Sequence, residues 1–244
     1  MTLDNNDVAA ALDELWETGY TRVGLTGSQA DDLGRLETVL TTLAEPLHVY
    51  RRHPFWKPLV ADPDRPAGRS GGTGLNSLHI DCVNTTHPPD LVCIYCVRPD
   101  PLGGGRTIVA PLDQVESQLT AQTLRVLQRP VFRDGTVHDL DHVGADANPF
   151  PVLAARGWRW RYTGRLLESG SIAANSAEHA ALLEFDRVMM SRAIGFTLDA
   201  GEALVVDQRR VLHGRFPLGV GQEHVSTDRR RLLVQSYYRG LRND

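Results

Sequence analysis

Three segments near the end of the chain, at 203–208, 210–216 and 230–239, are rich in β-branched and aromatic residues and are typical of strands. They lack the strict alternation of strand and helix that a parallel sheet requires. Strands in this arrangement pair most naturally as antiparallel neighbours. We therefore expect an α+β fold that is mostly β, with a double-stranded β-helix (jelly roll) core.

Helices are expected at the front of the chain and between strands, where they would support this core. An apolar stripe predicts a helix over 6–18, ended by Gly19, and a second helix is expected from the candidate cap Ser28 to Leu43. Two more helices are predicted at 112–128 and 177–193. Further strands are predicted at 21–25, 91–97 and 106–110, and strand-like segments at 130–134 and 158–163.

The chain contains no Pro/Gly/Ser-rich linker long enough to separate two cores, so we expect one domain over residues 1–244. The most irregular stretch, 61–76, suits a lid or active-site loop. This loop and the segment 138–157 are expected to hold the determinants of substrate choice.

Charge and hydropathy exclude several classes of partner. The net charge of −4 and pI of about 6.1 argue against a nucleic-acid-binding protein, which usually carries a basic surplus. The chain has no run of about 18 apolar residues, so no membrane span is predicted. The polar, acidic N-terminus lacks the features of a signal peptide, so a cytoplasmic location is expected.

Three cysteines, an odd and small number, do not form a disulfide framework. Cys93 and Cys96 have the CxxC spacing but lie in the apolar segment 91–97. Residues three apart on a strand point to opposite faces, so we expect these two to be core residues.

A His-x-Asp pair, His79 and Asp81, is the strongest chemical signal. In an extended segment residues two apart share a face, so the imidazole and the carboxylate project together. A third ligand from a distant strand would complete a triad of two histidines and one carboxylate, which leaves open positions on an iron(II) ion. The best candidate is His213, 132 positions beyond Asp81. By contrast, His138 and His142 lie in a Gly/Asp-rich loop and do not suggest a second metal site.

Three blocks in order along about residues 75–240 resemble the TauD/TfdA and clavaminate-synthase-like iron(II)/2-oxoglutarate dioxygenases. The first is LHIDCVNTTHPPDLVCIYCVRPDPLGGGRT, the second is LDAGEALVVDQRRVLHGRFPL and the third is DRRRLLVQSYYRG. The resemblance implies that His79, Asp81 and His213 bind iron, and that 2-oxoglutarate and dioxygen are co-substrates.

The resemblance also assigns the 2-oxoglutarate residues. Arg231 would form the salt bridge to the distal carboxylate, with Thr107 hydrogen-bonded to the same group; a guanidinium suits this role because it grips a carboxylate in a bidentate fork. Arg229 and Arg230 leave the register open, and Arg231 is preferred because it directly precedes the Leu232-Leu233 pair. Arg215 either helps to hold 2-oxoglutarate or braces the sheet.

The chain departs from the family pattern at two positions. Gln235 stands where the family often has a second arginine that holds an anionic group of the substrate, and Gln208 stands where an asparagine is common. We interpret the Gln208 exchange as a structural variation. Asp81 is retained, whereas related halogenases have a small residue there, so oxygen chemistry is expected.

The resulting hypothesis is an oxygenase that hydroxylates a small molecule, an amino acid or a natural-product intermediate, free or tethered to a carrier protein, with release of succinate and carbon dioxide. Asn76, Asn84 and Gln235 are candidate substrate contacts, although ordinary turn chemistry explains the two asparagines equally well. Two alternatives stay open: the same site could perform oxidative cyclisation or desaturation, or the chain could be a non-catalytic metal-binding jelly roll.

Overall fold

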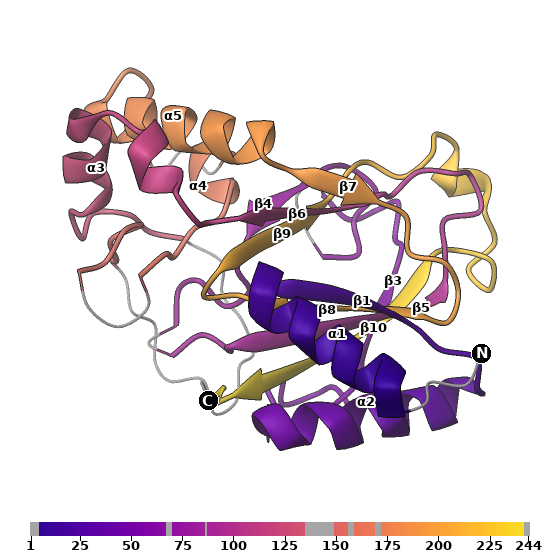
Figure 1. Ribbon diagram of the computed structural model, residues 1–244. Helices are drawn as coiled ribbons and strands as arrows, with labels where there is room; N and C mark the ends of the chain where they lie inside the picture. Colours follow the sequence, from indigo (N-terminus) through magenta and orange to yellow (C-terminus); the bar gives the residue numbers. More distant parts are fainter. Residues whose placement is uncertain are drawn as a thin grey trace.

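The structure is a computed structural model, and it describes residues 5–66, 70–85, 87–134, 149–155, 159–168 and 172–241. Its strands form two antiparallel sheets (Figure 1). In the larger sheet the order is β1-β8-β5-β10-β2, and β3 pairs with β10 alongside. In the smaller sheet the order is β4-β9-β6-β7. The mostly β, helix-containing class predicted from the sequence is thereby confirmed.

The strands of the larger sheet are β1 (Tyr20–Gly24), β2 (Glu45–Leu47), β3 (Lys57–Val60), β5 (Leu91–Arg98), β8 (Glu202–Asp207) and β10 (Leu232–Arg239). Those of the smaller sheet are β4 (Asn76–His79), β6 (Thr107–Pro111), β7 (Ile194–Phe196) and β9 (Val211–Arg215). The helices are α1 (Asn5–Thr18), α2 (Gln29–Leu43), α3 (Ala121–Leu127), α4 (Arg165–Glu168) and α5 (Ala177–Ser191), with short 3₁₀ turns η1 (Val115–Gln118) and η2 (Gln222–His224).

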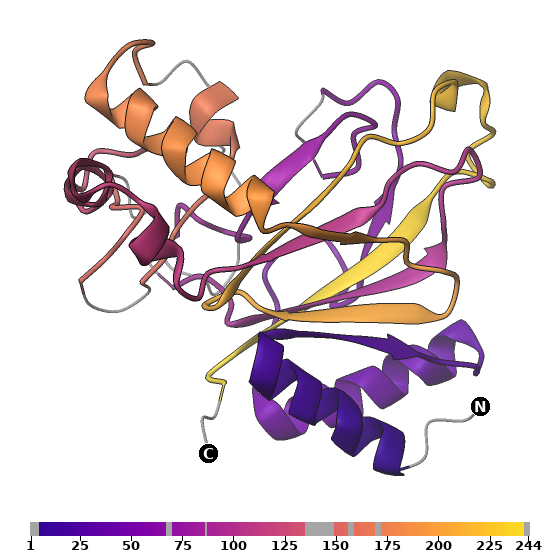
Figure 2. The same cartoon turned by 45° about the horizontal axis from the view of Figure 1, so that its top comes forward.

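Helices cover the outer face of each sheet, and the two inner faces pack against each other (Figure 2). Helices α1 and α2 lie on the larger sheet, where Leu15 and Leu40 pack with Val205. Helices α3 and α5 lie on the smaller sheet, where Phe185 packs with Leu212. Ser28 and Ser176 cap α2 and α5 through their side-chain oxygens, as Ser-initiated helices require. The sheets thus form the middle layers of the molecule.

Alternation along β5 explains how one strand serves two cores. Leu91, Cys93 and Tyr95 face α1 and α2, whereas Ile94 and Cys96 face the smaller sheet. The prediction that Cys93 and Cys96 point to opposite faces is confirmed, and both are free thiols.

Some predicted elements are wrong in their details. The single helix expected at 112–128 is interrupted, because Leu119 and Thr120 have extended backbones (ψ 148° and 151°) between the 3₁₀ turn η1 and the helix α3. In the described residues of 130–134 and 158–163 only isolated bridges occur, such as that between Phe132 and Phe150, and no strand. Trp160 and Tyr162 pack on Phe185 as core residues.

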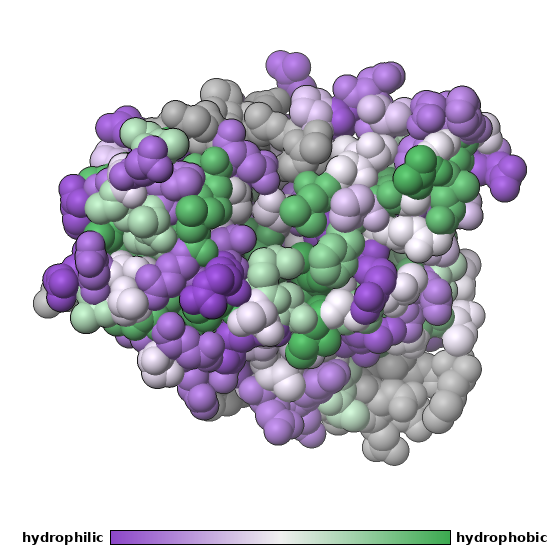
Figure 3. Space-filling model, turned by 90° about the horizontal axis from the view of Figure 1, so that it is seen from above, coloured by the Kyte–Doolittle hydropathy of each residue, from purple (hydrophilic) through white to green (hydrophobic). Residues whose placement is uncertain are grey.

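The surface seen from above mixes apolar and hydrophilic side chains in small neighbouring groups (Figure 3). Within the described part of the chain, no helix combines the length and the apolar character needed to cross a membrane. His138 and His142 lie outside the described residues, as does most of the segment 138–157.

Candidate active site

Two histidines face each other between the sheets, on neighbouring strands of the smaller sheet. Strand β4 ends at His79, whose Cα pairs with that of His213 in β9, and the two ring centroids are 4.4 Å apart. Leu78 and Ile80, on either side of His79, are fully buried in the core beneath α5. Their burial turns the imidazole of His79 towards the other sheet.

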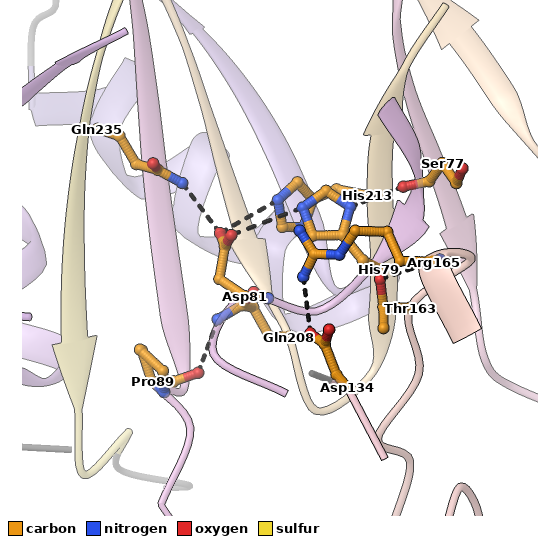
Figure 4. A network of polar contacts seen from close by, with 10 residues as sticks. All are labelled: Ser77, His79, Asp81, Pro89, Asp134, Thr163, Arg165, Gln208, His213 and Gln235. Atoms are coloured by element: carbon orange, nitrogen blue, oxygen red, sulfur yellow. Dashed lines mark hydrogen bonds and ion pairs between the residues drawn. The ribbon is translucent and has the colours of Figure 1, made fainter. Parts of the chain in front are cut away.

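Asp81 completes the group just beyond the end of β4 (Figure 4). Its Oδ1 lies 3.6 Å from Nε2 of His79 and its Oδ2 lies 3.3 Å from Nε2 of His213. One potential ligand atom from each of the three residues lies within 4.8 Å of the other two. The side chains that the spacing predicted to converge do lie together, although His213 is 132 positions beyond Asp81 in the chain.

The protonation states of these residues fit a metal ion. Nδ1 of His79 lies 2.7 Å from the carbonyl oxygen of Ser77. A carbonyl oxygen only accepts, so Nδ1 carries the proton and Nε2 keeps a free lone pair. Burial, aided by the neighbouring His79, lowers the pKa of His213 and favours its neutral imidazole. Burial alone would raise the pKa of Asp81, but the adjacent His213 and His79 hold it well below its usual range, as a carboxylate.

Two imidazoles and one carboxylate that meet from one side are the donor set of iron(II) sites with open positions. His79, Asp81 and His213 therefore fit a ferrous ion. No other group of three such side chains is close enough to hold a metal ion in the part of the chain that the structure describes.

Glutamine side chains fix Asp81 at both its backbone and its carboxylate. The Asp81 N–H donates to Oε1 of Gln208 at 2.6 Å, and Nε2 of Gln208 donates to the Pro89 carbonyl at 2.9 Å. Nε2 of Gln235, from β10 in the other sheet, donates to Asp81 Oδ2 at 2.9 Å. Sequence reasoning missed both contacts, because it treated Gln208 as a mere variation and Gln235 as a substrate contact.

We predict that Gln235→Leu weakens metal binding about 10- to 100-fold, since partners that orient a ligand contribute at that scale. Leucine keeps the volume at this buried site but donates no hydrogen bond. The measurement is competition with a chelator for Zn(II) or Fe(II). The matched control is Ser236→Ala, because Ser236 pairs with Cys93 and faces the opposite side of β10; equal metal affinity in the two variants would contradict the prediction.

A pocket leads from the three potential metal ligands towards the end of β10, where Arg231 lies. It is lined by Leu59, Ala61, Ser70, Gly71, Gly72, Asn76, His79, Asp81, Ile94, Thr107, His213, Gly214, Arg215, Leu218, Arg231, Leu233 and Gln235. Residues from both sheets and from the loop 61–76 therefore share one cavity, as the sequence suggested for that loop. Asn84 is buried but is not among the lining residues.

Arg231 and Arg215 have different surroundings at this end of the pocket. Arg215 donates to the carbonyls of Gly72 and Gly74, so it braces the loop 61–76. Among the described residues Arg231 has no carboxylate within ion-pair distance, and burial lowers its pKa to about 10. It remains a cation at neutral pH, free to pair with an anion, whereas Arg229 is exposed and outside the lining.

A buried aspartate joins the two loops that flank Arg231. Asp100 accepts hydrogen bonds from the N–H groups of Leu102, Gly104 and Gly219 and from Nε2 of Gln222. A Cβ on Gly104 would lie 2.1 Å from the nitrogen of Gly219, which explains the glycine-rich turn at this position. The Gly104 turn thus packs directly against the segment after β9.

Asp100→Asn is predicted to lower the free energy of unfolding by about 1–3 kcal/mol, since its amide cannot accept all four bonds. Burial raises the pKa of Asp100, but the four donors outweigh it and the net pKa lies below the usual 3.8. A depressed pKa contributes stability that is full above about pH 4 and lost as the pH falls through the folded-state value. Thermal unfolding measured from pH 7 to pH 3 should show the melting temperatures of the wild type and Asp100→Asn converging as the pH falls. The control is Glu223→Gln, at an exposed carboxylate. A difference in melting temperature that stays constant with pH would contradict the assignment.

Another ion pair lies beside the metal-ligand group, and no sequence motif marks it. Nη2 of Arg165, at the start of α4, donates to Oδ2 of Asp134 at 2.9 Å (Figure 4). Arg161, which alternation in a predicted strand would have left exposed, is buried and donates to the carbonyls of Val83 and Thr85 behind Asp81. Arg161 thus supports the segment that carries Asp81.

The chain was compared with known proteins. No family model matches it. It is 29% identical over 148 residues to an L-asparagine oxygenase of Streptomyces coelicolor, an alignment that covers 61% of this chain but less than half, 44%, of that protein. A structure of asparagine oxygenase with Fe(II), 2S,3S-3-hydroxyasparagine and succinate superposes with a TM-score of 0.73, 21% identity and coverage of 96% and 78% of the two chains.

A second structure, the non-heme iron oxygenase OrfP with Fe, succinate and (3S)-hydroxy-L-Arg, gives a TM-score of 0.71 at 16% identity, with coverage of 97% and 82%. The chain has the fold of the non-heme iron oxygenases. The resemblance to the TauD/TfdA-like iron(II)/2-oxoglutarate oxygenases inferred from the sequence blocks is confirmed by these relatives.

Proposed function

We propose that this chain is an iron(II)- and 2-oxoglutarate-dependent oxygenase that hydroxylates an unactivated C–H bond of a small molecule, an amino acid or an intermediate derived from one. The observation that carries the proposal is the pocket that joins the His79, Asp81 and His213 group to Arg231, a cation with no carboxylate within ion-pair distance among the described residues. A protein that only binds a metal ion does not need a cation in the same pocket.

In this proposal His79, Asp81 and His213 hold the ion, which supplies activation of dioxygen as 2-oxoglutarate is converted to succinate and carbon dioxide. Arg231 pairs with the distal carboxylate, and Thr107, on β6 and buried in the same pocket, donates its hydroxyl to that group. Arg215 holds Gly72 and Gly74 in place beside the pocket. Gln208 holds the backbone of Asp81, and Gln235 holds its carboxylate.

The substrate class rests on the relatives, whose bound products are hydroxylated asparagine and arginine. We infer an amino acid, free or carried by a protein, as the substrate of this chain. The two sheets would form a double-stranded β-helix core, in a single domain spanning residues 1–244. Desaturation or ring closure would use the same residues.

The proposal is tested by adding Fe(II) and 2-oxoglutarate to the metal-free protein without oxygen, which should give a weak visible charge-transfer band. Aerobic assays of succinate formation with a panel of L-amino acids, beginning with asparagine and arginine, then identify the substrate. Absence of the band, together with tightly retained zinc, would favour the non-catalytic alternative.

A further inference from the structure

Lys57, the only lysine of the chain, lies on the inner face of the larger sheet beyond the pocket. On β3 it pairs with Gln235 of β10, and Leu59 pairs with Leu233 in the same way. Paired residues of antiparallel strands project to the same side. Leu59, Leu233 and Gln235 all line the pocket, so Lys57 continues the inward row next to the glutamine that contacts Asp81.

The ammonium of Lys57 has an aromatic neighbour but no anionic partner. Its Nζ lies 3.4 Å from the ring centroid of Tyr50, which is 6.1 Å from the ring of Tyr237 on β10. Among the described residues no carboxylate is within ion-pair distance of it. Burial lowers the pKa of Lys57, and the negative charge of Asp81 acts in the opposite direction. A half-buried cation of this kind is costly unless an anion joins it.

Lys57 and Arg231 mark opposite ends of the site. Gln235, the partner of Lys57, is four residues further along the chain than Arg231, a separation of roughly 13 Å on an extended strand. Asp81 contacts Gln235 and therefore lies nearer to the Lys57 end. Arg231 is thus available for a co-substrate, and Lys57 is available for a second molecule beside the metal ligands.

We propose that Lys57 is the anchor for a carboxylate of the substrate, held over the ring of Tyr50 so that the rest of the molecule reaches the metal ligands. This inference rests on the proposed function. It also explains why Gln235 replaces the arginine that often binds the substrate in the family. The Gln235 amide contacts Asp81, and the cation that binds the substrate lies on the adjacent strand instead. The site would accept carboxylic acids and reject the matching amides.

The single lysine provides a direct test that does not depend on turnover. Protein grown with [ε-¹³C]lysine gives one Lys57 signal by NMR. The Zn(II)-loaded protein, saturated with 2-oxoglutarate to fill the Arg231 end, is titrated with propionate and, in parallel, with propionamide. We expect a saturable shift of the Lys57 signal with propionate and none with propionamide. The methyl signals of Met189 and Met190, in the core beneath α5, should stay fixed.

A Lys57 signal that responds equally to both compounds, or to neither, would overturn the inference. Failure of the protein to bind Zn(II) and 2-oxoglutarate would instead contradict the proposed function, and the titration of the metal-free protein would still report on Lys57. With the acid identified by succinate formation, Lys57→Gln should raise KM more than about tenfold with a smaller change in kcat, and Lys57→Arg should restore most of the loss.

Discussion

Asp81→Ala protein is expected to bind ferrous ion more than about 100-fold more weakly than the wild type and to form no succinate above background. The loss exceeds that of an orienting partner such as Gln235, because a ligand itself is removed. It also leaves His79 and His213 facing each other without the carboxylate that lies within 3.6 Å of both. Metal affinity by chelator competition and succinate formation are the two measurements.

The control for Asp81→Ala is Asp13→Ala, which removes an exposed carboxylate from α1. Both variants should show the wild-type far-ultraviolet circular dichroism, so that a folding defect is distinguished from loss of a ligand. Wild-type succinate formation by Asp81→Ala would show that Asp81 does not bind the metal.

Arg231→Gln is expected to weaken 2-oxoglutarate binding by about 2–4 kcal/mol, or about 30- to 1000-fold, while metal affinity should stay within a few-fold of the wild type. The physical reason is that a buried dicarboxylate would lose the one pocket cation without a carboxylate or carbonyl partner among the described residues. Calorimetric titration of 2-oxoglutarate into Zn(II)-loaded protein measures the change.

Arg229→Gln is the matched control, since it removes an exposed guanidinium two residues away. It also tests the register that the sequence left open among Arg229, Arg230 and Arg231. A larger loss of affinity in Arg229→Gln than in Arg231→Gln would place the co-substrate elsewhere.

Local composition and spacing predicted the elements that position the site. An apolar run predicted β5, β-branched and aromatic content predicted β8, β9 and β10, and the HxD spacing predicted that His79 and Asp81 share a face. These features depend only on residues that lie close together in the sequence. The short strands β2, β3 and β7 were missed because three or four residues carry too little pattern.

Contacts across the fold could not be predicted in the same way. Gln235 reaches Asp81 over 154 positions, and Lys57 meets Tyr50 because β2 and β3 pair with consecutive parts of β10. Neither pair has a motif, and their geometry depends on how β2 and β3 pair one after the other along a single edge of β10. The segment 158–163 was assigned to a strand on its aromatic alternation, but Trp160 and Tyr162 pack around Phe185 without a continuous strand partner.

The division of the site between two sheets links binding to the cohesion of the whole molecule. The imidazoles belong to the smaller sheet, and Arg231, Gln235 and Lys57 to the larger one. Any molecule that contacts both groups of residues connects the two sheets and opposes their separation. Ligand binding and the packing of the two sheets therefore stabilise each other. A substitution that loosens the contact between β4 and β10 would lower ligand affinity before it unfolds the protein.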